Sequence, residues 1–152
     1  MITLKDFKGF KFPGQTLDGM QEFAFIKPDI DYYTSGNSVV IESHFHPSRS
    51  YVYNENLEDK DLLKHEICHF SITEYWAREF KRRVAALESM PSGAELEGIY
   101  EEIKVQEMQM QMDYDDKSYH GYVLKEQREW ENNVDSLLSS LDKFKFKEVV
   151  FK

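Results

Sequence analysis

The stretch from about Glu58 to Leu87 constrains the fold most strongly, because its apolar residues recur at three- and four-residue steps. This period is typical of one long α-helix, which Met90-Pro91-Ser92-Gly93 would end. The first half of the predicted helix contains His65-Glu66-Ile67-Cys68-His69, an H-E-x-x-H motif. Residues four apart on a helix differ by about 40° in azimuth, so the two histidines are expected to project from one face and hold one metal ion.

H-E-x-x-H is the arrangement from which zinc metallopeptidases are built. We therefore predict Zn²⁺ as the cofactor, with His65 and His69 as two of its ligands. Glu66 follows the first of these ligands and is predicted to be the general base, because a carboxylate there can take the proton of an attacking water. The predicted reaction is the hydrolysis of a peptide bond in a peptide or protein substrate.

A catalytic zinc site needs a third protein ligand, and the H-E-x-x-H helix does not provide an obvious one. The extended zincin pattern is absent, since Ile72 and Tyr75 occupy its glycine and histidine positions. Glu74 lies about 180° around the helix from His65, so it is expected to face away and to contact another helix. The third ligand must therefore come from elsewhere in the chain.

Two other parts of the sequence contain candidate ligands. His120 follows a run of aspartates in a polar segment and is predicted to be the third ligand, with Asp115 as the alternative. His44 and His46 form an H-x-H pair whose side chains would share one face of a strand, which is another recognised metal-binding geometry. We interpret this pair as strand-end residues near the cleft.

The remaining pattern predicts an α+β fold with a small N-terminal antiparallel or mixed sheet packed on the long helix. Proline, glycine and polar residues predict turns in this part of the chain at residues 13–14, 17–19, 27–29 and 35–38. Residues Ser38–His46 alternate as a strand, and we expect this strand to be an edge to which an extended peptide substrate adds. Two further helices are expected, the last with an apolar stripe from Val123 to Leu141, and the tail Phe144–Phe151 alternates like a short strand. The whole chain, residues 1–152, is predicted to be one domain.

The second predicted helix begins at a capping box formed by Ser92 and Glu95. We expect it to end before Tyr114–Gly121, a polar segment interpreted as a loop. Its three alternating methionines are interpreted as core residues; they are Met108, Met110 and Met112.

Composition excludes some functions and leaves others open. The formal net charge of −9 and the absence of a basic patch argue against nucleic-acid binding. No run is long enough for a transmembrane helix, and the first residues lack the apolar region of a signal peptide, so the compartment is not predicted. Cys68 is the only cysteine and is interpreted as a buried thiol. The oligomeric state is not predicted.

Two blocks of the chain resemble a bacterial family of inferred secreted zinc-dependent proteases, long catalogued as a domain of unknown function. Residues 62–78, LLKHEICHFSITEYWAR, resemble the family's core H-E-Q-G-H-F-D-I-x-E. Residues 114–121, YDDKSYHG, resemble its second block Y-D-x-x-T-x-H-G, and Gln127 and Trp130 match the Q-x-x-W that follows. The resemblance implies a zincin-like domain with His65, His69 and His120 as zinc ligands and Glu66 as the base.

Two further expectations concern catalysis. Tyr114 or Tyr119 is a candidate donor to the developing oxyanion, and of these we select Tyr119 as a catalytic residue. The alternative to a peptidase is a non-catalytic zinc-binding interaction module with the same fold. A non-haem iron oxygenase is a third interpretation, which requires a carboxylate ligand in place of His120.

Overall fold

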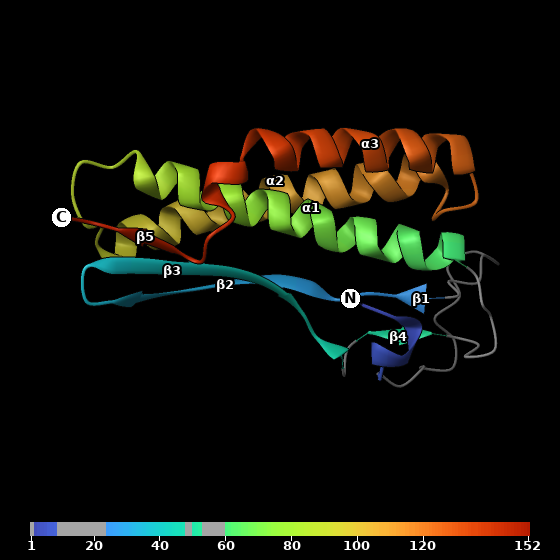
Figure 1. Cartoon of the computed structure of the whole chain (residues 1–152), viewed down its shortest axis with the longest axis horizontal. Coiled ribbons are helices and arrows are strands. Elements are labelled where there is room, and N and C mark those ends of the chain that lie inside the picture. Colours follow the sequence, from blue (N-terminus) through green and yellow to red (C-terminus); the bar gives the residue numbers. More distant parts are fainter. Residues whose placement is uncertain (1, 9–23, 48–49, 53–59) are drawn as a thin grey trace.

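The computed structural model describes residues 2–8, 24–47, 50–52 and 60–152. In this part of the chain, three helices lie over one side of a three-stranded antiparallel sheet, which confirms the α+β class (Figure 1). None of the described helices combines the length and the apolar character that a membrane crossing requires. The helices are α1 (Lys60–Ala85), α2 (Gly93–Ser118) and α3 (Leu124–Ser140).

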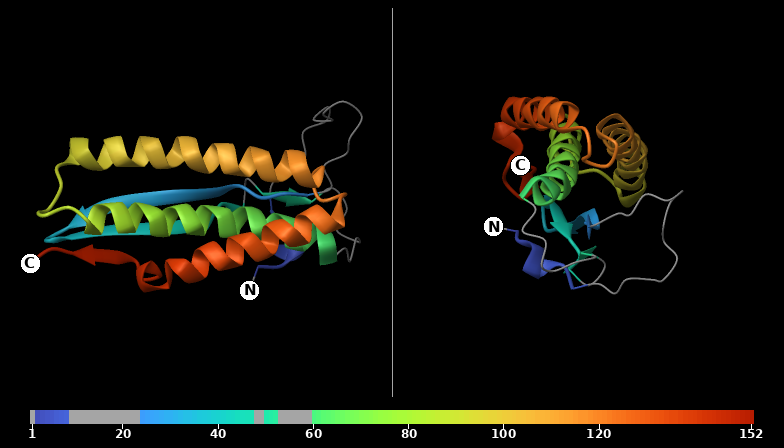
Figure 2. Two further views of the ribbon diagram at one scale, coloured as in Figure 1. Left: turned by 90° about the horizontal axis from the view of Figure 1, so that it is seen from above. Right: turned by 90° about the vertical axis from the view of Figure 1, so that its right-hand side faces the viewer.

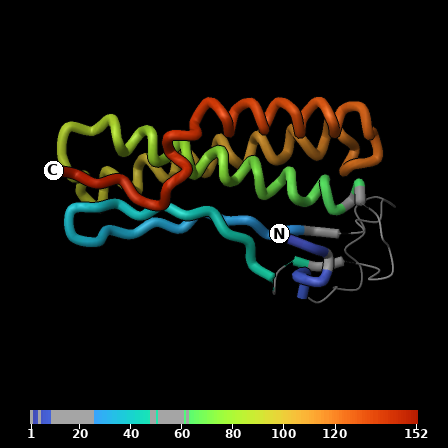
Figure 3. Tube along the Cα trace, in the orientation of Figure 1, coloured from blue at the N-terminus to red at the C-terminus, as the bar shows by residue number. Residues whose placement is uncertain are grey.

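The main sheet has the strand order β2-β3-β5, and both pairings are antiparallel. A separate two-stranded pairing joins β1 to β4, and short 3₁₀ helices, η1 and η3, lie near the two ends of the chain. Figure 3 shows the chain returning from α3 to place its last strand beside β3. The strands are β1 (Ala24–Phe25), β2 (Pro28–Ser35), β3 (Ser38–Phe45), β4 (Tyr51–Val52) and β5 (Glu148–Val150), and the 3₁₀ helices are η1 (Leu4–Asp6) and η3 (Asp142–Phe144).

A two-residue turn sets the register of β2 against β3. Gly36 has φ +60°, the positive value that the first central position of a II′ hairpin turn requires, and Ser35 pairs with Ser38. The turn expected at Ser35–Ser38 is thus confirmed, whereas Pro28 and Asp29, expected in another turn, lie inside β2. The turns expected around residues 13–14 and 17–19 lie outside the described residues.

One face of this hairpin forms the main core with α1 and α2. Ile30 and Ile41 point at the helices, where Phe80 of α1 and Ile103 of α2 are completely buried. A second cluster joins α1 to α2 and α3 and contains Cys68, so the prediction of a buried thiol at this position is confirmed. Figure 2 shows the result as a helical layer, with α1 between α2 and α3, above the sheet.

The expectation that the strand from Ser38 onwards is an edge is wrong for its first half. β3 is the central strand, because Ser38–Val40 pairs with β5 on one side while the whole strand pairs with β2 on the other. The outer edge next to α2 belongs to β2, whose first residue, Pro28, has no N–H to offer another strand.

α2 differs from expectation at its end and on its surface. It continues through the segment that was expected to be a loop and stops at Ser118, because Tyr114 is fully buried against α1 and α3 and the helix must persist to place it there. Met110 packs in the core as expected, but Met108 and Met112 are 59% and 57% exposed, so that prediction was wrong for two of the three methionines. The capping box of Ser92 and Glu95 is confirmed.

Truncation of the central core residue Phe80 tests this packing. Phe80→Ala removes a completely buried ring and should lower the free energy of unfolding by about 3–5 kcal/mol. Val105→Ala, on the exposed surface of α2, is the control and should change it by less than about 0.5 kcal/mol. Urea unfolding of both variants measures the difference, and equal effects would contradict the assigned core.

Candidate metal centre

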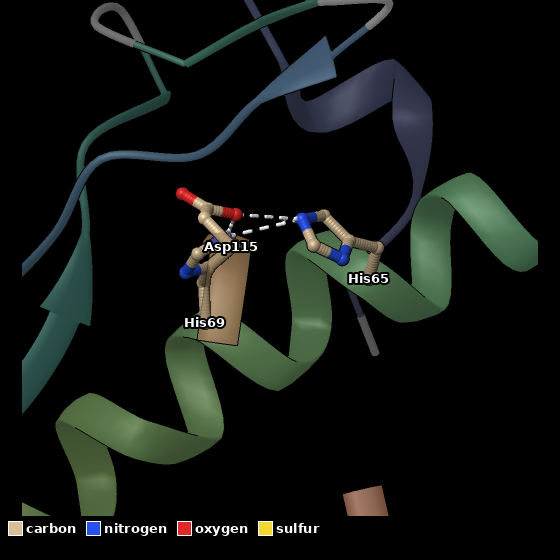
Figure 4. A group of neighbouring side chains, drawn as sticks. All are labelled: His65, His69 and Asp115. Carbon is tan, nitrogen blue, oxygen red and sulfur yellow. Dashed lines mark hydrogen bonds and ion pairs between the residues drawn. The ribbon is translucent and has the colours of Figure 1, made fainter. Parts of the chain in front are cut away.

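The first half of α1 and the last turns of α2 bring two histidines and one carboxylate together. His65 and His69 project from the same face of α1, as predicted, and Asp115 reaches them from α2 (Figure 4). His65 Nε2 lies 3.0 Å and His69 Nε2 2.9 Å from the same Asp115 oxygen, Oδ1. We refer to His65, His69 and Asp115 as the triad.

The geometry of the triad fits one small cation. The two Nε2 atoms lie 3.2 Å apart, so the three potential ligand atoms form a triangle with edges of 2.9–3.2 Å. Ligand atoms held at about 2.0–2.1 Å by a tetrahedral ion are separated by about 3.3–3.4 Å, so only slight expansion is needed. Two imidazoles and a carboxylate are also a donor set that zinc accepts. The triad is therefore a possible metal site, and the identity of the metal is not shown.

The charges of Asp115 and His69 stabilise each other although both side chains are largely buried. Burial disfavours the charged form of Asp115, but its contacts with His65 and His69 outweigh this and hold the pKa of the carboxyl well below its usual range. Burial likewise opposes a charge on His69, yet Asp115 raises the pKa of His69 to about 9. Burial lowers the pKa of His65. Without metal, His69 is therefore protonated and pairs with the Asp115 carboxylate. A bound cation would displace this proton.

His69 is held in place by a hydrogen-bonded network that continues along the contact between α1 and α2. Its Nδ1–H donates to Gln111 Oε1 at 2.6 Å, and Gln111 Nε2 in turn donates to the His69 carbonyl and to Thr73 Oγ1. Thr73 donates to Glu107, which also accepts from Lys104 Nζ at 2.7 Å. Because Nδ1 is occupied as a donor, the proton that a cation would displace is the one on Nε2, and its loss leaves the Nε2 lone pair directed towards the triad.

His65 is positioned by packing instead. Its ring stacks on Tyr114 at a centroid distance of 4.6 Å, and the Tyr114 hydroxyl donates to the His65 carbonyl at 3.4 Å. A Cβ on Gly121 would lie 3.2 Å from His65 Nδ1 and 3.0 Å from Gln127 Oε1, two buried atoms with no hydrogen-bond partner in the described part of the chain. Gly121, at φ +90°, is thus required both by its backbone conformation and by its closeness to the ring.

His120, the predicted third ligand, lies beside the triad. Its Nδ1 is 3.6 Å from Asp115 Oδ1, and its backbone adopts a left-handed conformation directly after α2 ends. The alternative ligand, Asp115, occupies the position next to both α1 histidines. Ligation by His120 stays a prediction.

The two predicted catalytic residues differ in their surroundings. Glu66 is buried, and its Oε2 accepts the backbone N–H of Ile26 at 2.9 Å; its charge also contributes to the raised pKa of His69, so it lies near the triad. Tyr119 is 58% exposed at the C-cap of α2. Tyr114, the other tyrosine considered, is fully buried with its hydroxyl directed at the α1 backbone, so it packs against the site rather than facing a substrate.

Glu74 faces away from the triad, but its expected contact with another helix is wrong. It accepts hydrogen bonds from Arg78, one turn further along α1, and from Ser43 of β3. Arg78 connects to α3 through the Leu138 carbonyl.

Sequence reasoning missed Gln111 and the network that it organises. A signal was present, because Glu107, Gln111 and Asp115 recur at four-residue steps in α2 and so share one face. His65, His69 and Thr73 form the corresponding row in α1. Gln127 had been noted as a motif residue only, and its position beside His65 and Gly121 gives it a structural role.

Comparisons with known protein families, with characterised proteins and with solved structures give no match to this chain. The resemblance to zinc-dependent proteases therefore stays a prediction.

Removal of each candidate third ligand separates their roles. We expect Asp115→Ala to lower zinc affinity by more than the roughly 10–100-fold that loss of an outer-shell partner costs, because it removes an atom at 2.9–3.0 Å from both imidazoles. His120→Ala should lower it by no more than about 10–100-fold. Competition with a chromophoric chelator measures both constants. The reverse order would establish His120 as the third ligand.

Gly121 supplies a matched pair of glycine substitutions. Gly121→Ala should weaken zinc binding and destabilise the fold, because the new Cβ meets the His65 ring and the backbone has a positive φ. Gly98→Ala meets nothing within 4 Å in the interior of α2 and should instead stabilise the protein by about 0.5–1 kcal/mol. Thermal unfolding with and without zinc distinguishes the two, and unaltered zinc binding in Gly121→Ala would contradict the close packing.

Proposed function

We propose that this protein is a zinc-dependent peptidase. The supporting observation is that the histidines of the H-E-x-x-H motif converge with Asp115 while Glu66, the residue between them in sequence, lies buried nearby. A His₂–carboxylate set with an open position is used by known zinc peptidases. The fold class and the donor set agree with this function, and the substrate and the zincin-like architecture are part of the proposal.

His65, His69 and Asp115 would hold the ion. His120, whose Nδ1 lies 3.6 Å from Asp115 Oδ1, could move to become a further ligand or could interact with the Asp115 carboxylate. Bound zinc would supply Lewis acidity, which activates water and polarises a carbonyl group. Gln111 keeps the His69 ring in the tautomer that binds metal through Nε2. Tyr114 and Gly121 both pack against the His65 ring and hold it in place.

Glu66 acts as the general base. It accepts a proton from water as the water oxygen forms a bond to the peptide carbonyl carbon, and it returns the proton to the amine when the C–N bond breaks. The hydrogen bond from Ile26 N–H fixes the position of the carboxylate. Tyr119, exposed next to His120, is the proposed donor to the oxyanion.

An extended peptide would bind along the outer edge of β2. Because His46 N–H donates to the Lys27 carbonyl, alternate residues of β2 pair with β3, and the backbone groups of the others point outward. Nearest the triad this edge offers carbonyl groups only, because Pro28 has no N–H and the Ile30 N–H donates to Asp29. Ile26, immediately before β2, contacts Glu66, so this edge leads directly to the proposed base.

A second function is favoured by one observation. Two histidines and one carboxylate also form the facial triad of mononuclear non-haem iron enzymes, and Asp115 provides that carboxylate. Metal analysis of protein purified without chelators decides between the two ions. Iron with no zinc would favour the oxygenase, whereas bound zinc without hydrolysis would favour the non-catalytic zinc module.

Glu66→Gln tests the peptidase directly. The amide oxygen can still accept the Ile26 N–H, so the fold and zinc affinity should be retained, while peptide hydrolysis should fall by about 10²–10⁴-fold through loss of the base. The measurement is cleavage of a fluorogenic peptide library by the zinc-loaded protein. Glu129→Gln, on the exposed surface of α3, is the matched control and should retain activity. Undiminished hydrolysis in Glu66→Gln would refute the mechanism.

A further inference from the structure

We propose that the strand-end histidines His44 and His46, with Asp29, form a second metal site, separate from the triad and independent of the proposed peptidase function. His44 lies in β3, and His46 is the first residue after this strand. Asp29 of β2 pairs with His44 across the hairpin. The site would take a divalent transition ion that prefers imidazole nitrogen. Asp31, next along the same face of β2, would orient one of its rings.

The two imidazole pairs in this protein have nearly the same geometry. The rings of His44 and His46 are 4.7 Å apart at 90°, with 3.3 Å between their Nε2 atoms. The corresponding values for His65 and His69 are 4.8 Å, 89° and 3.2 Å. In both pairs the Nε2 atoms face each other at the separation expected for ligands of one tetrahedral ion, about 3.3–3.4 Å. The alternation of a strand thus produces the same arrangement that a helix produces with residues four apart.

Carboxylates complete the second pair on two sides. Asp29 Oδ2 lies 3.9 Å from His46 Nε2, close enough to become the third ligand by a small side-chain movement. Asp31 Oδ2 lies 3.5 Å from His44 Nδ1, which favours the tautomer with the proton on Nδ1 and the lone pair on Nε2. The second site would therefore have two nitrogen ligands already facing each other, an oxygen ligand once Asp29 moves towards His46, and a carboxylate that orients one imidazole.

The surrounding charges permit a cation at this position. Lys104 lies 3.3 Å from Asp29 Oδ1, but its charge is balanced by Glu107 at 2.7 Å, and Oδ2 remains directed at His46. The three side chains are each about one-third exposed, so an ion can enter from solvent.

Two neutral imidazoles and a carboxylate favour late first-row ions, and we expect Cu²⁺ and Zn²⁺ to bind this site. Partial exposure and the longer carboxylate distance should make it the weaker of the two sites for Zn²⁺.

Zinc titration of the metal-free full-length protein tests the proposal. Equilibrium dialysis should give about two equivalents of zinc for the unaltered chain and about one for the His44→Ala/His46→Ala variant. Glu42→Gln is the matched control on the same face of β3, because Glu42 pairs with Lys147 rather than with the histidines. It should retain both equivalents.

Proton–carbon NMR of the histidine rings is measured on the unaltered protein, so its result does not depend on whether a variant folds. Zinc should shift the ring signals of His65 and His69 first, and those of His44 and His46 at higher concentration. Unshifted His44 and His46 signals at saturating zinc, or equal zinc stoichiometry in the unaltered chain and the His44→Ala/His46→Ala variant, would overturn the second site while leaving the triad and the peptidase proposal untouched.

Discussion

A polar contact between α1 and α2 determines where the candidate site lies. His65, His69 and Thr73 form one row on α1, and Asp115, Gln111 and Glu107 form the opposing row on α2. The helices run antiparallel, so each residue of one row meets its counterpart in the other. We call these six residues the polar seam. Because its members recur every four residues on both helices, the seam fixes the axial register of the helices more specifically than apolar side chains would.

Burial of the seam is tolerable because its groups satisfy one another. Gln111 donates twice and accepts once, and both Glu107 oxygens accept hydrogen bonds. The end at the triad is different, since two Nε2 atoms and a carboxylate oxygen meet there and can share only one or two protons. A divalent cation would satisfy all three at once. At the Glu107 end, the seam is therefore a hydrogen-bonded support. At the triad, it leaves a carboxylate and two imidazole nitrogens whose interactions a bound cation would complete.

The periodicity of the sequence predicted the helices and strands well, but it predicted contacts between distant segments less well. The H-E-x-x-H helix, the capping box at Ser92 and the hairpin turn at Gly36 depend on contacts within a few residues, so the sequence contained the necessary information. The extension of α2 to Ser118 depends instead on burial of Tyr114 by α1 and α3, which no local pattern reveals. A polar composition suggested a loop there, but Asp115 faces α1 while Asp116 and Lys117 lie on the exposed surface of the helix.

The choice between His120 and Asp115 shows the same limit. Both occur within six residues of the chain, and ligand chemistry allows either one. What separates them is the left-handed turn after α2, since Tyr119 and His120 both have positive φ while Asp115 is still helical. That turn also brings Gly121 against the His65 ring. The end of one helix thus positions a candidate ligand, a neighbouring histidine and a glycine, and both the run of aspartates and the motif resemblance pointed to this segment.

Lys104 connects the seam to the sheet and explains how the hairpin is oriented over the helices. It binds Glu107 at the end of the seam and Asp29 in β2, while Ser43 of β3 donates to Glu74 on α1. The apolar contacts of Ile30 and Ile41 alone would allow the hairpin to slide, because they are not directional. These two polar links are directional, and they hold the start of β2, and with it the Ile26 N–H that binds Glu66, in place over α1. The position of the proposed base therefore depends on the sheet as much as on the helix that carries it.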